Sequence, residues 1–244
     1  MMKTDVVLLT KATNGLVYKS ITELCKYSKD SIGTLIVCYT GDDSKEVMKL
    51  GKLLDGISVN SVLDIGEYNF AKLNNEMVRR HASSKCILFM NDDVILRSDA
   101  VAPCLKILED NSIGAVGIKL LYGDDTIQHA GVFWACNSNG ICQGVGHLHH
   151  RENNRAIPPY SVPGVTGAFL MMRLEDFNSI GGFDEHFKHC FEDVVICKRI
   201  KDKGMSIICN NFVEATHYES QTRKQAICRE DIHRLMEILN GNIK

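Results

Sequence analysis

A short apolar run that ends in acidic residues is the feature of this sequence that most constrains its fold. Residues 87–90 read Ile-Leu-Phe-Met. A continuous apolar run too short for a helix is typical of a strand buried on both faces of a parallel sheet. The polarity then changes at once to Asn91-Asp92-Asp93. Because ligands bind outside the carboxyl ends of strands in open α/β sheets, this acidic end is a candidate binding site.

The two adjacent carboxylates, Asp92 and Asp93, repel each other at close range unless a cation neutralises them. A hard divalent ion such as Mg²⁺ or Mn²⁺, shared with a phosphate group, would do so. The alternative is that both side chains belong to a solvated turn, since short acidic motifs often match by chance. The motif alone leaves both interpretations open.

The composition of the 244 residues excludes several classes of protein. Hydrophobic residues make up 45% and charged residues 24%, as in ordinary globular proteins, and a net charge of −2 argues against nucleic-acid binding. We find no apolar stretch long enough to span a bilayer and no signal-peptide pattern. Ten cysteines without a Cys-x-x-Cys pair favour a cytoplasmic protein with reduced thiols, and the spacing of a zinc site is absent.

The first half of the chain alternates between strand and amphipathic-helix patterns. Three strand–helix units followed by a fourth strand predict right-handed crossovers and a doubly wound, mostly parallel α/β sheet, as in nucleotide-binding domains. The expected strands are 5–9, 32–39, 57–63 and the acidic strand within 86–96, and the expected helices are 16–28, a second ending before Gly56, and 70–82.

The second half is less regular, and no linker separates it from the first. We therefore expect a single domain, 1–244, with a nucleotide-binding half, 1–97, and a smaller mixed half, 98–244. The expected strands there are 115–121, 126–135, 140–145, 165–174 and 205–218, and the expected helices are 102–108, 174–180, 192–203 and 229–239. Residues 147–163 are polar, contain prolines and lack periodicity, which indicates a mobile loop.

Two further positions carry groups suited to chemistry. Glu192-Asp193 begins a predicted helix, where the helix dipole favours carboxylates, so these residues could simply cap the helix. His217 ends the last predicted strand, a place where a lone histidine is more often packed or solvated than a ligand. Each site alone is weak evidence, whereas the combination of the three is more informative.

The order of these motifs resembles glycosyltransferase family 2, nucleotide-sugar-dependent enzymes with the GT-A fold. In the first half, Asn75 in a helix and the Asp pair that ends the fourth strand match as well, so the resemblance covers nearly the whole chain. It looks closest to the branch that builds surface polysaccharides (O-antigen-type enzymes), where 126–131, His147 and 217–223 have counterparts. The matching features of the second half are Thr166-Gly167-Ala168, Gly181-Gly182-Phe183-Asp184-Glu185, Glu192-Asp193, Arg199, Gly204 and His217.

The resemblance implies a role for each acidic or imidazole group. Sugar transfer must stabilise a departing pyrophosphate, and a divalent cation, Mn²⁺ or Mg²⁺, offsets that charge. The resemblance places Asp93 and His217 on this metal and Asp92 near the ribose or the metal. Inversion in one displacement needs a base on the opposite face of the sugar. By resemblance this base is Asp193, with Glu192 as the second choice.

The nucleotide of the donor is expected to lie against the ends of the first strands. Surface roles for the basic residues among these contacts are an equal alternative. The expected donor contacts are Thr10, Lys11, Tyr39, Thr40, Lys72, Asn75, Asn91, Asp92 and Arg223.

The sequence departs from the family pattern at three positions. Tyr39 replaces an aspartate that binds the nucleobase in many members, Asn91 replaces the first acid of Asp-x-Asp, and Val195 occupies a position that is often acidic. Processive members carry Gln-x-x-Arg-Trp beyond the base. The only tryptophan here, Trp134, precedes it, which favours transfer of a single sugar.

The sequence therefore predicts an inverting, metal-dependent glycosyltransferase of surface polysaccharide synthesis, with a nucleoside-diphosphate sugar as donor and a glycan, lipid-linked or protein-linked acceptor. A lipid-linked acceptor would bring this cytoplasmic protein to a membrane surface. One alternative is a sugar-phosphate nucleotidyltransferase, although residues 10–15 contain one lysine and one glycine and fit a phosphate loop poorly. The other is a non-catalytic nucleotide-sugar-binding module, which the three departures motivate.

Overall fold

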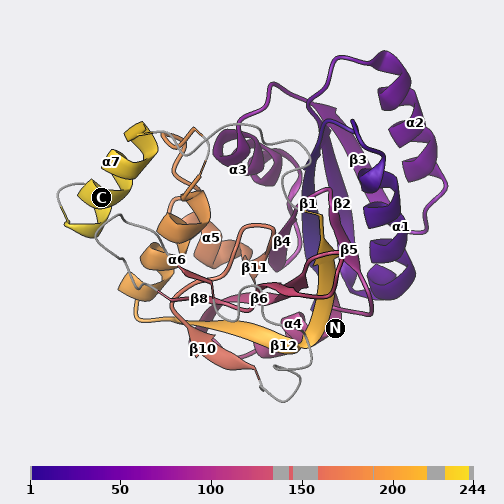
Figure 1. The fold of residues 1–244 in the computed structure, drawn as a ribbon. Coiled ribbons are helices and arrows are strands. Elements are labelled where there is room, and N and C mark those ends of the chain that lie inside the picture. Colours follow the sequence, from indigo (N-terminus) through magenta and orange to yellow (C-terminus); the bar gives the residue numbers. More distant parts are fainter. Residues whose placement is uncertain (1, 134–142, 145–158, 189, 219–228, 242–244) are drawn as a thin grey trace.

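The computed structural model describes residues 2–133, 143–144, 159–188, 190–218 and 229–241 (Figure 1). Their main feature is a mixed sheet in the order β10-β12-β6-β11-β4-β1-β2-β3, with β5 paired to β12 and β7 to β6. The strands are β1 Thr4–Thr10, β2 Ile32–Tyr39, β3 Asn60–Ile65, β4 Cys86–Met90, β5 Val94–Leu96, β6 Ile113–Leu121, β7 Ile127–His129, β8 Val132–Phe133, β9 Gln143–Gly144, β10 Tyr160–Val162, β11 Phe169–Arg173 and β12 Ser206–His217. The helices are α1 Leu16–Ser28, α2 Ser44–Asp55, α3 Phe70–His81, α4 Val101–Ile107, α5 Leu174–Ser179, α6 Glu192–Asp202 and α7 Arg229–Leu239, and a 3₁₀ turn, Lys29–Ser31, follows α1.

The first half forms the predicted doubly wound parallel unit. β1 pairs in parallel with β2 and β4, and β2 pairs in parallel with β3, while α1, α2 and α3 are the crossovers. The third strand lies at 60–65 rather than 57–63, because its ladder begins with Asn60 opposite Thr34. Ile57 and Val59 instead pack against the core from the connection that follows α2.

The acidic strand, β4, is central, and all five of its residues are buried. Leu88 and Met90 pack on the face that α1, α2 and α4 cover, whereas Ile87 and Phe89 pack on the face that α3, α5 and α6 cover. Figure 1 shows α1 and α2 on one side of β4 and α3, α5 and α6 on the other. The burial of this run on both faces, expected from its unbroken apolar character, is confirmed.

The second half extends the same sheet with mixed directions. β11 lies antiparallel between β4 and β6, and β12 runs parallel to β6. The end of β12 pairs with β5, so that His217 lies opposite Val94, directly after the acidic residues. Two segments more than 100 residues apart in the chain therefore meet at the carboxyl ends of β4 and β12.

Several predicted boundaries in this half were wrong. The strand expected at 165–174 begins only at Phe169, because Thr166–Ala168 form a turn in which the Phe169 amide donates to the Thr166 carbonyl at 3.4 Å. The strand expected at 126–135 is divided into β7 and β8 at Gly131, whose φ of 105° does not fit a strand.

The loop expected at 147–163 was wrong at its end, where Tyr160–Val162 form β10 and pair antiparallel with β12. Prolines at 159 and 163 flank this edge strand, a position where a missing amide donor is tolerated. The rest of that loop and residues 134–142, which include Trp134 and join the strands expected at 126–135 and 140–145, lie outside the described residues. Among the residues that are described, none of the helices is long and apolar enough to cross a membrane.

Candidate active site

The acidic residues after β4 are held by contacts from β1 and from the turn before β11. The Asn91 amide donates to the Ala168 carbonyl at 3.0 Å, and Thr10 Oγ1 donates to Asp92 Oδ2 at 2.6 Å. Burial, together with the smaller effect of the Asp93 charge, raises the pKa of Asp92 to about 6 against the opposing Thr10 hydrogen bond. Asp93 itself is buried, so the solvated-turn interpretation of this pair is wrong for Asp93.

His217 meets Asp93 across the two strand ends, as the resemblance implied. Their closest atoms, His217 Nε2 and Asp93 Oδ1, are 3.1 Å apart, and both side chains are at least nine-tenths buried. The backbone fixes this approach, because the Tyr218 amide donates to the Asp93 carbonyl at 3.2 Å. The two groups expected to share an ion thus lie within reach of one.

Gln128 on β7 determines which nitrogen of His217 faces Asp93. Gln128 Oε1 lies 2.5 Å from His217 Nδ1, and an amide oxygen can only accept, so Nδ1 carries the proton. In the neutral ring Nε2 then presents a lone pair. Asn91 Nδ2 lies 3.4 Å from Nε2, in a position to donate to it.

This tautomer directs two electron-rich atoms toward the same point. Asp93 Oδ1 is buried and receives no hydrogen bond from the residues that the structure describes, although an orphaned buried carboxylate oxygen is costly. A cation between Asp93 Oδ1 and His217 Nε2 would satisfy both atoms, and a carboxylate with an imidazole suits Mn²⁺. Within the described ranges, no group of three His, Cys, Asp or Glu side chains is placed to hold a metal. Phosphate and water oxygens are suited to further positions around such a cation.

Asp193 lies at the start of α6, which begins after Phe191 in the left-handed conformation, with a φ of 76°. Its Oδ2 accepts from the Gly167 amide at 2.9 Å, and its Oδ1 accepts from the Val194 amide at 2.8 Å. Gly167 belongs to the turn whose Ala168 carbonyl receives the Asn91 amide. The candidate base is therefore tied to the same turn as the acidic end of β4. The neighbouring Glu192 is buried.

His129, next to Gln128 on β7, supports this turn from the other side. Its Nε2 accepts from the Thr166 amide at 3.3 Å. Burial, together with the smaller effect of the nearby His217, lowers the pKa of His129 to about 3, so the ring is neutral at physiological pH. A neutral ring is what the hydrogen bond requires, because a protonated imidazole has no acceptor nitrogen.

The ends of β1 and β2 line an open cleft of about 730 Å³. Lys11, Tyr39 and Thr40, all predicted donor contacts, are among its lining residues. Tyr39 is buried, and its hydroxyl accepts from the Asp43 amide at 3.1 Å, so its ring is held in place beside the cleft. Thr40 is fastened to β1, since its amide donates to the Thr10 carbonyl at 2.7 Å.

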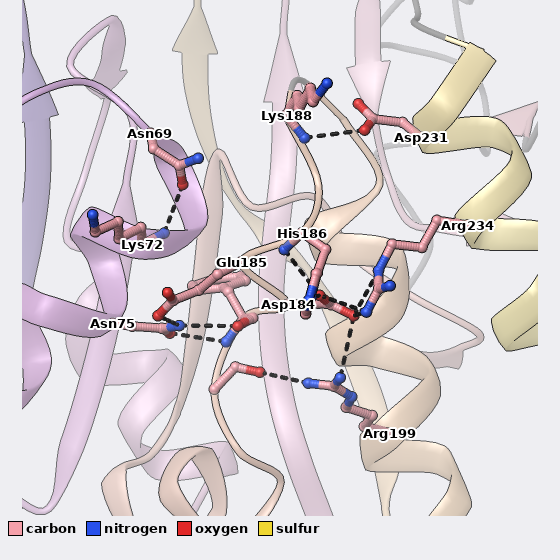
Figure 2. Close-up of polar contacts among 12 residues, drawn as sticks. Asn69, Lys72, Asn75, Asp184, Glu185, His186, Lys188, Arg199, Asp231 and Arg234 are labelled. Carbon is pink, nitrogen blue, oxygen red and sulfur yellow. Dashed lines mark hydrogen bonds and ion pairs between the residues drawn. The ribbon is translucent and has the colours of Figure 1, made fainter. Parts of the chain in front are cut away.

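Two predicted donor contacts lie on α3 and make their hydrogen bonds away from the acidic cluster. The Lys72 side chain is exposed, and Figure 2 shows it directed away from Asn75. The Asn75 amide group instead bridges to the second half: its Oδ1 accepts from the Phe183 amide, and its Nδ2 donates to the Phe183 carbonyl and to Glu185 Oε1, each at 2.9 Å. Donor roles for both remain predictions. Arg223 lies outside the described residues.

Gln128, His129 and Gly167 were not assigned roles from the sequence. All three stood in segments quoted for the resemblance, but their contacts depend on the antiparallel pairing of β7 with β6 and on the turn before β11. A polar residue before a histidine and a glycine in a turn are too common to identify a site without that tertiary arrangement.

The fold matches solved glycosyltransferase structures along almost its whole length. GalNAc-T7 with UDP, GalNAc and Mn²⁺ superimposes with a TM-score of 0.77 and 12% identity, over 98% of this chain and 48% of that one. This chain has the GT-A fold. The mannosyltransferase PcManGT from Pyrobaculum calidifontis, solved with GDP-Man and Mn²⁺, gives a TM-score of 0.64 and 14% identity, over 90% of this chain and 58% of that one.

Sequence comparisons indicate the same class. Residues 147–224 match a family described as the N-terminal domain of galactosyltransferase. The chain is 30% identical to the O-antigen biosynthesis protein RfbC of Myxococcus xanthus over 64% of its length, but spans only 12% of that protein. It is 24% identical to the rhamnosyltransferase WbbL of Escherichia coli, over 72% of this chain and 70% of WbbL. The predicted resemblance to glycosyltransferases of the O-antigen type is thereby confirmed.

Proposed function

We propose that this chain is a single-domain glycosyltransferase that moves one sugar from a nucleoside-diphosphate sugar to an acceptor hydroxyl, with inversion at the anomeric carbon. The observation that supports the proposal is a close carboxylate–imidazole pair at the carboxyl ends of β4 and β12, with a third carboxylate bonded to the neighbouring turn. Asp93 and His217 lie 3.1 Å apart, and Asp193 is bonded to the turn that also receives the Asn91 amide.

Asp93 and His217 would hold Mn²⁺ or Mg²⁺, and the bound cation would neutralise charge on the departing diphosphate. Gln128 keeps the Nε2 lone pair of His217 directed into that position. Next to this pair, the ends of β1 and β4 carry hydroxyl, amide and carboxylate groups on Thr10, Asn91 and Asp92. These groups are suited to binding the ribose or the phosphates.

Asp193 would act as the base. As the acceptor oxygen bonds to the anomeric carbon, its proton passes to Asp193, and the bond between that carbon and the diphosphate breaks with its electron pair leaving on the diphosphate. Each oxygen of Asp193 accepts one backbone hydrogen bond and keeps lone-pair capacity for this proton. Glu192, which is buried, is the second choice.

The cleft at the ends of β1 and β2 would receive the nucleoside through Lys11, Tyr39 and Thr40, and Lys72, Asn75 and Arg223 complete the proposed donor contacts. The name of RfbC, an O-antigen biosynthesis protein, supports a role in surface polysaccharide synthesis, and that of WbbL, a rhamnosyltransferase, supports sugar transfer. The proposed acceptor is a glycan or a lipid-linked or protein-linked one. A lipid-linked acceptor would place the reaction in the cytoplasm at a membrane surface.

The test begins with a thermal-shift screen of nucleotide sugars with Mn²⁺, because a ligand that binds the native state raises the melting temperature. With the donor identified, Asp193→Asn should lower the transfer rate by about 10²–10⁴-fold while donor binding stays within about twofold, since only the proton acceptor is lost. Asp202→Asn, an exposed change on the same helix, is the matched control.

A parental transfer rate in Asp193→Asn would refute the base assignment. Release of pyrophosphate from a nucleoside triphosphate and a sugar phosphate would indicate the nucleotidyltransferase alternative. Donor binding without transfer or donor hydrolysis, over a broad set of acceptors, would indicate the binding module.

A further inference from the structure

A buried carboxylate outside the proposed reaction site joins α6 to α7. Asp184 has a side chain only 2% exposed. Arg234 on α7 donates to both of its oxygens, from Nη2 at 2.8 and 3.1 Å and from Nε at 3.2 Å, whereas Arg199 on α6 reaches Oδ2 at 3.4 Å. His186 adds its amide and its Nδ1 to Oδ1 at 3.1 and 2.9 Å. Figure 2 shows these groups surrounding the carboxylate.

The charge of Asp184 is needed for this junction. Burial alone would raise the pKa of Asp184, but the hydrogen bonds from Arg234 and His186 more than offset it, so that the pKa lies below its usual range. A two-point contact between a guanidinium and a carboxylate also fixes the angle at which the two elements meet. Asp184 therefore holds α7 in one orientation against the segment 182–188.

A second buried carboxylate, Asp231 on α7, binds backbone amides just beyond Asp184 in the chain. Asp231, 1% exposed, accepts from the Lys188 amide at 3.0 Å and from the Cys190 amide at 3.3 Å. An apolar cluster also joins these elements, because Phe187 and Val195 pack against residues of α7. The remaining members of that cluster are Leu235 and Ile238, with Phe191, Val194 and Leu239 at its edge.

The segment 182–188 lies between α3 and α7 (Figure 2). On the α3 side Asn75 binds the backbone of Phe183. The chain then continues to Phe191, whose left-handed backbone begins α6, and two residues later carries Asp193. The first turn of α6 is thus placed by the contacts of the preceding segment, and α7 supplies many of them.

We infer that α7 is a positioning element, which through Arg234 and Asp231 sets the placement of Asp193 against the Gly167 amide. The inference rests on the proposed function, in which Asp193 is the base. Its physical basis is that a displacement of about 1 Å at a reacting group can cost about a hundredfold in rate, even when the change lies far from the chemistry. Arg234 and Asp231 are not among the described residues that line the cleft.

The experiment compares Arg234→Met, Arg234→Lys and Asp231→Asn with Glu237→Gln, an exposed change on α7 that leaves the junction intact. Arg234→Met should lower kcat for transfer by about tenfold to a hundredfold, with the donor KM and the Mn²⁺ affinity within about twofold of the parent. Arg234→Lys, which keeps the charge but loses the two-point contact, should recover part of the loss. Asp231→Asn, the milder change, serves if Arg234→Met does not fold, and should also lower kcat alone.

A second measurement does not depend on turnover. Hydrogen exchange of the Gly167 amide, which donates to Asp193, should be faster in Arg234→Met and Asp231→Asn than in Glu237→Gln. Unchanged kcat and unchanged exchange in folded variants would overturn the inference, and so would a parallel loss of kcat, donor affinity and Mn²⁺ affinity, which indicates general destabilisation. If the parent transfers no sugar from any donor, the proposed function fails by itself, and the Gly167 exchange still decides whether α7 places Asp193.

Discussion

The two sides of the candidate site are built in different ways. The backbone of the sheet holds Asp93 and His217, because the Tyr218 amide binds the Asp93 carbonyl and β12 pairs with β5 beside them. Asp193 is carried by a helix whose first turn depends on the contacts of the segment 182–188 with α3 and α7. Strand ends in one ladder share a rigid frame, whereas a helix terminus can shift with its neighbours. We therefore expect cation affinity and the chemical step to respond to different substitutions.

The largest expected effect tests the sheet side. Asp93→Asn removes a charged ligand at a buried position and should abolish measurable Mn²⁺ binding by calorimetry, with transfer reduced by about 10³-fold or more. Asp193→Asn, on the helix side, should retain Mn²⁺ binding. If Asp93→Asn bound Mn²⁺ like the parent, the division of the site into these two sides would be lost.

A smaller effect is expected for Gln128, which contacts the proposed cation ligand His217. Gln128→Leu removes the acceptor for His217 Nδ1 and frees the ring to turn, which should weaken Mn²⁺ binding by about tenfold to a hundredfold. Gln128→Glu keeps an acceptor oxygen and should stay close to the parent. Equal Mn²⁺ affinity in the parent and Gln128→Leu would show that the sheet alone orients His217.

The smallest effect concerns His129, which supports the turn shared by both sides. Its folded pKa of about 3 lies below the unfolded value, near 6.5, so between these values the unfolded chain binds one more proton than the native protein. Stability therefore falls as the pH falls below about 6.5, by about 1.4 kcal/mol for this group between pH 7.5 and 5.5. Urea unfolding at the two pH values should show this loss in the parent and not in His129→Gln.

A matched control for this measurement is His233→Gln, since the His233 side chain on α7 is 77% exposed. It should retain the parental pH dependence. The same pH dependence in His129→Gln as in the parent would show that His129 is not held neutral in the native protein.

The sequence predicted the elements of the first half well, because local patterns carry them. β2 and α1 have the predicted bounds, since the apolar run of one and the helical spacing of the other are complete within the element. The short β3 was displaced by three residues, because the pairing with β2 rather than the local pattern decides where a weak strand begins. In the second half β10 was missed for the same reason, as Tyr160–Val162 form a strand only through the edge of β12.

The candidate site shows the same division. The chain by itself determined the chemical groups, namely a buried acidic strand end, a pair of carboxylates opening a helix and a histidine ending the last strand. Only the tertiary structure decided that His217 reaches Asp93, that Gln128 selects its tautomer, and that α7 packs on the segment leading to Asp193. The physical reason is range: hydrophobic periodicity and helix-start signals act over a few residues, whereas these contacts join residues 43 to 124 positions apart, which only the packed sheet and helices bring together.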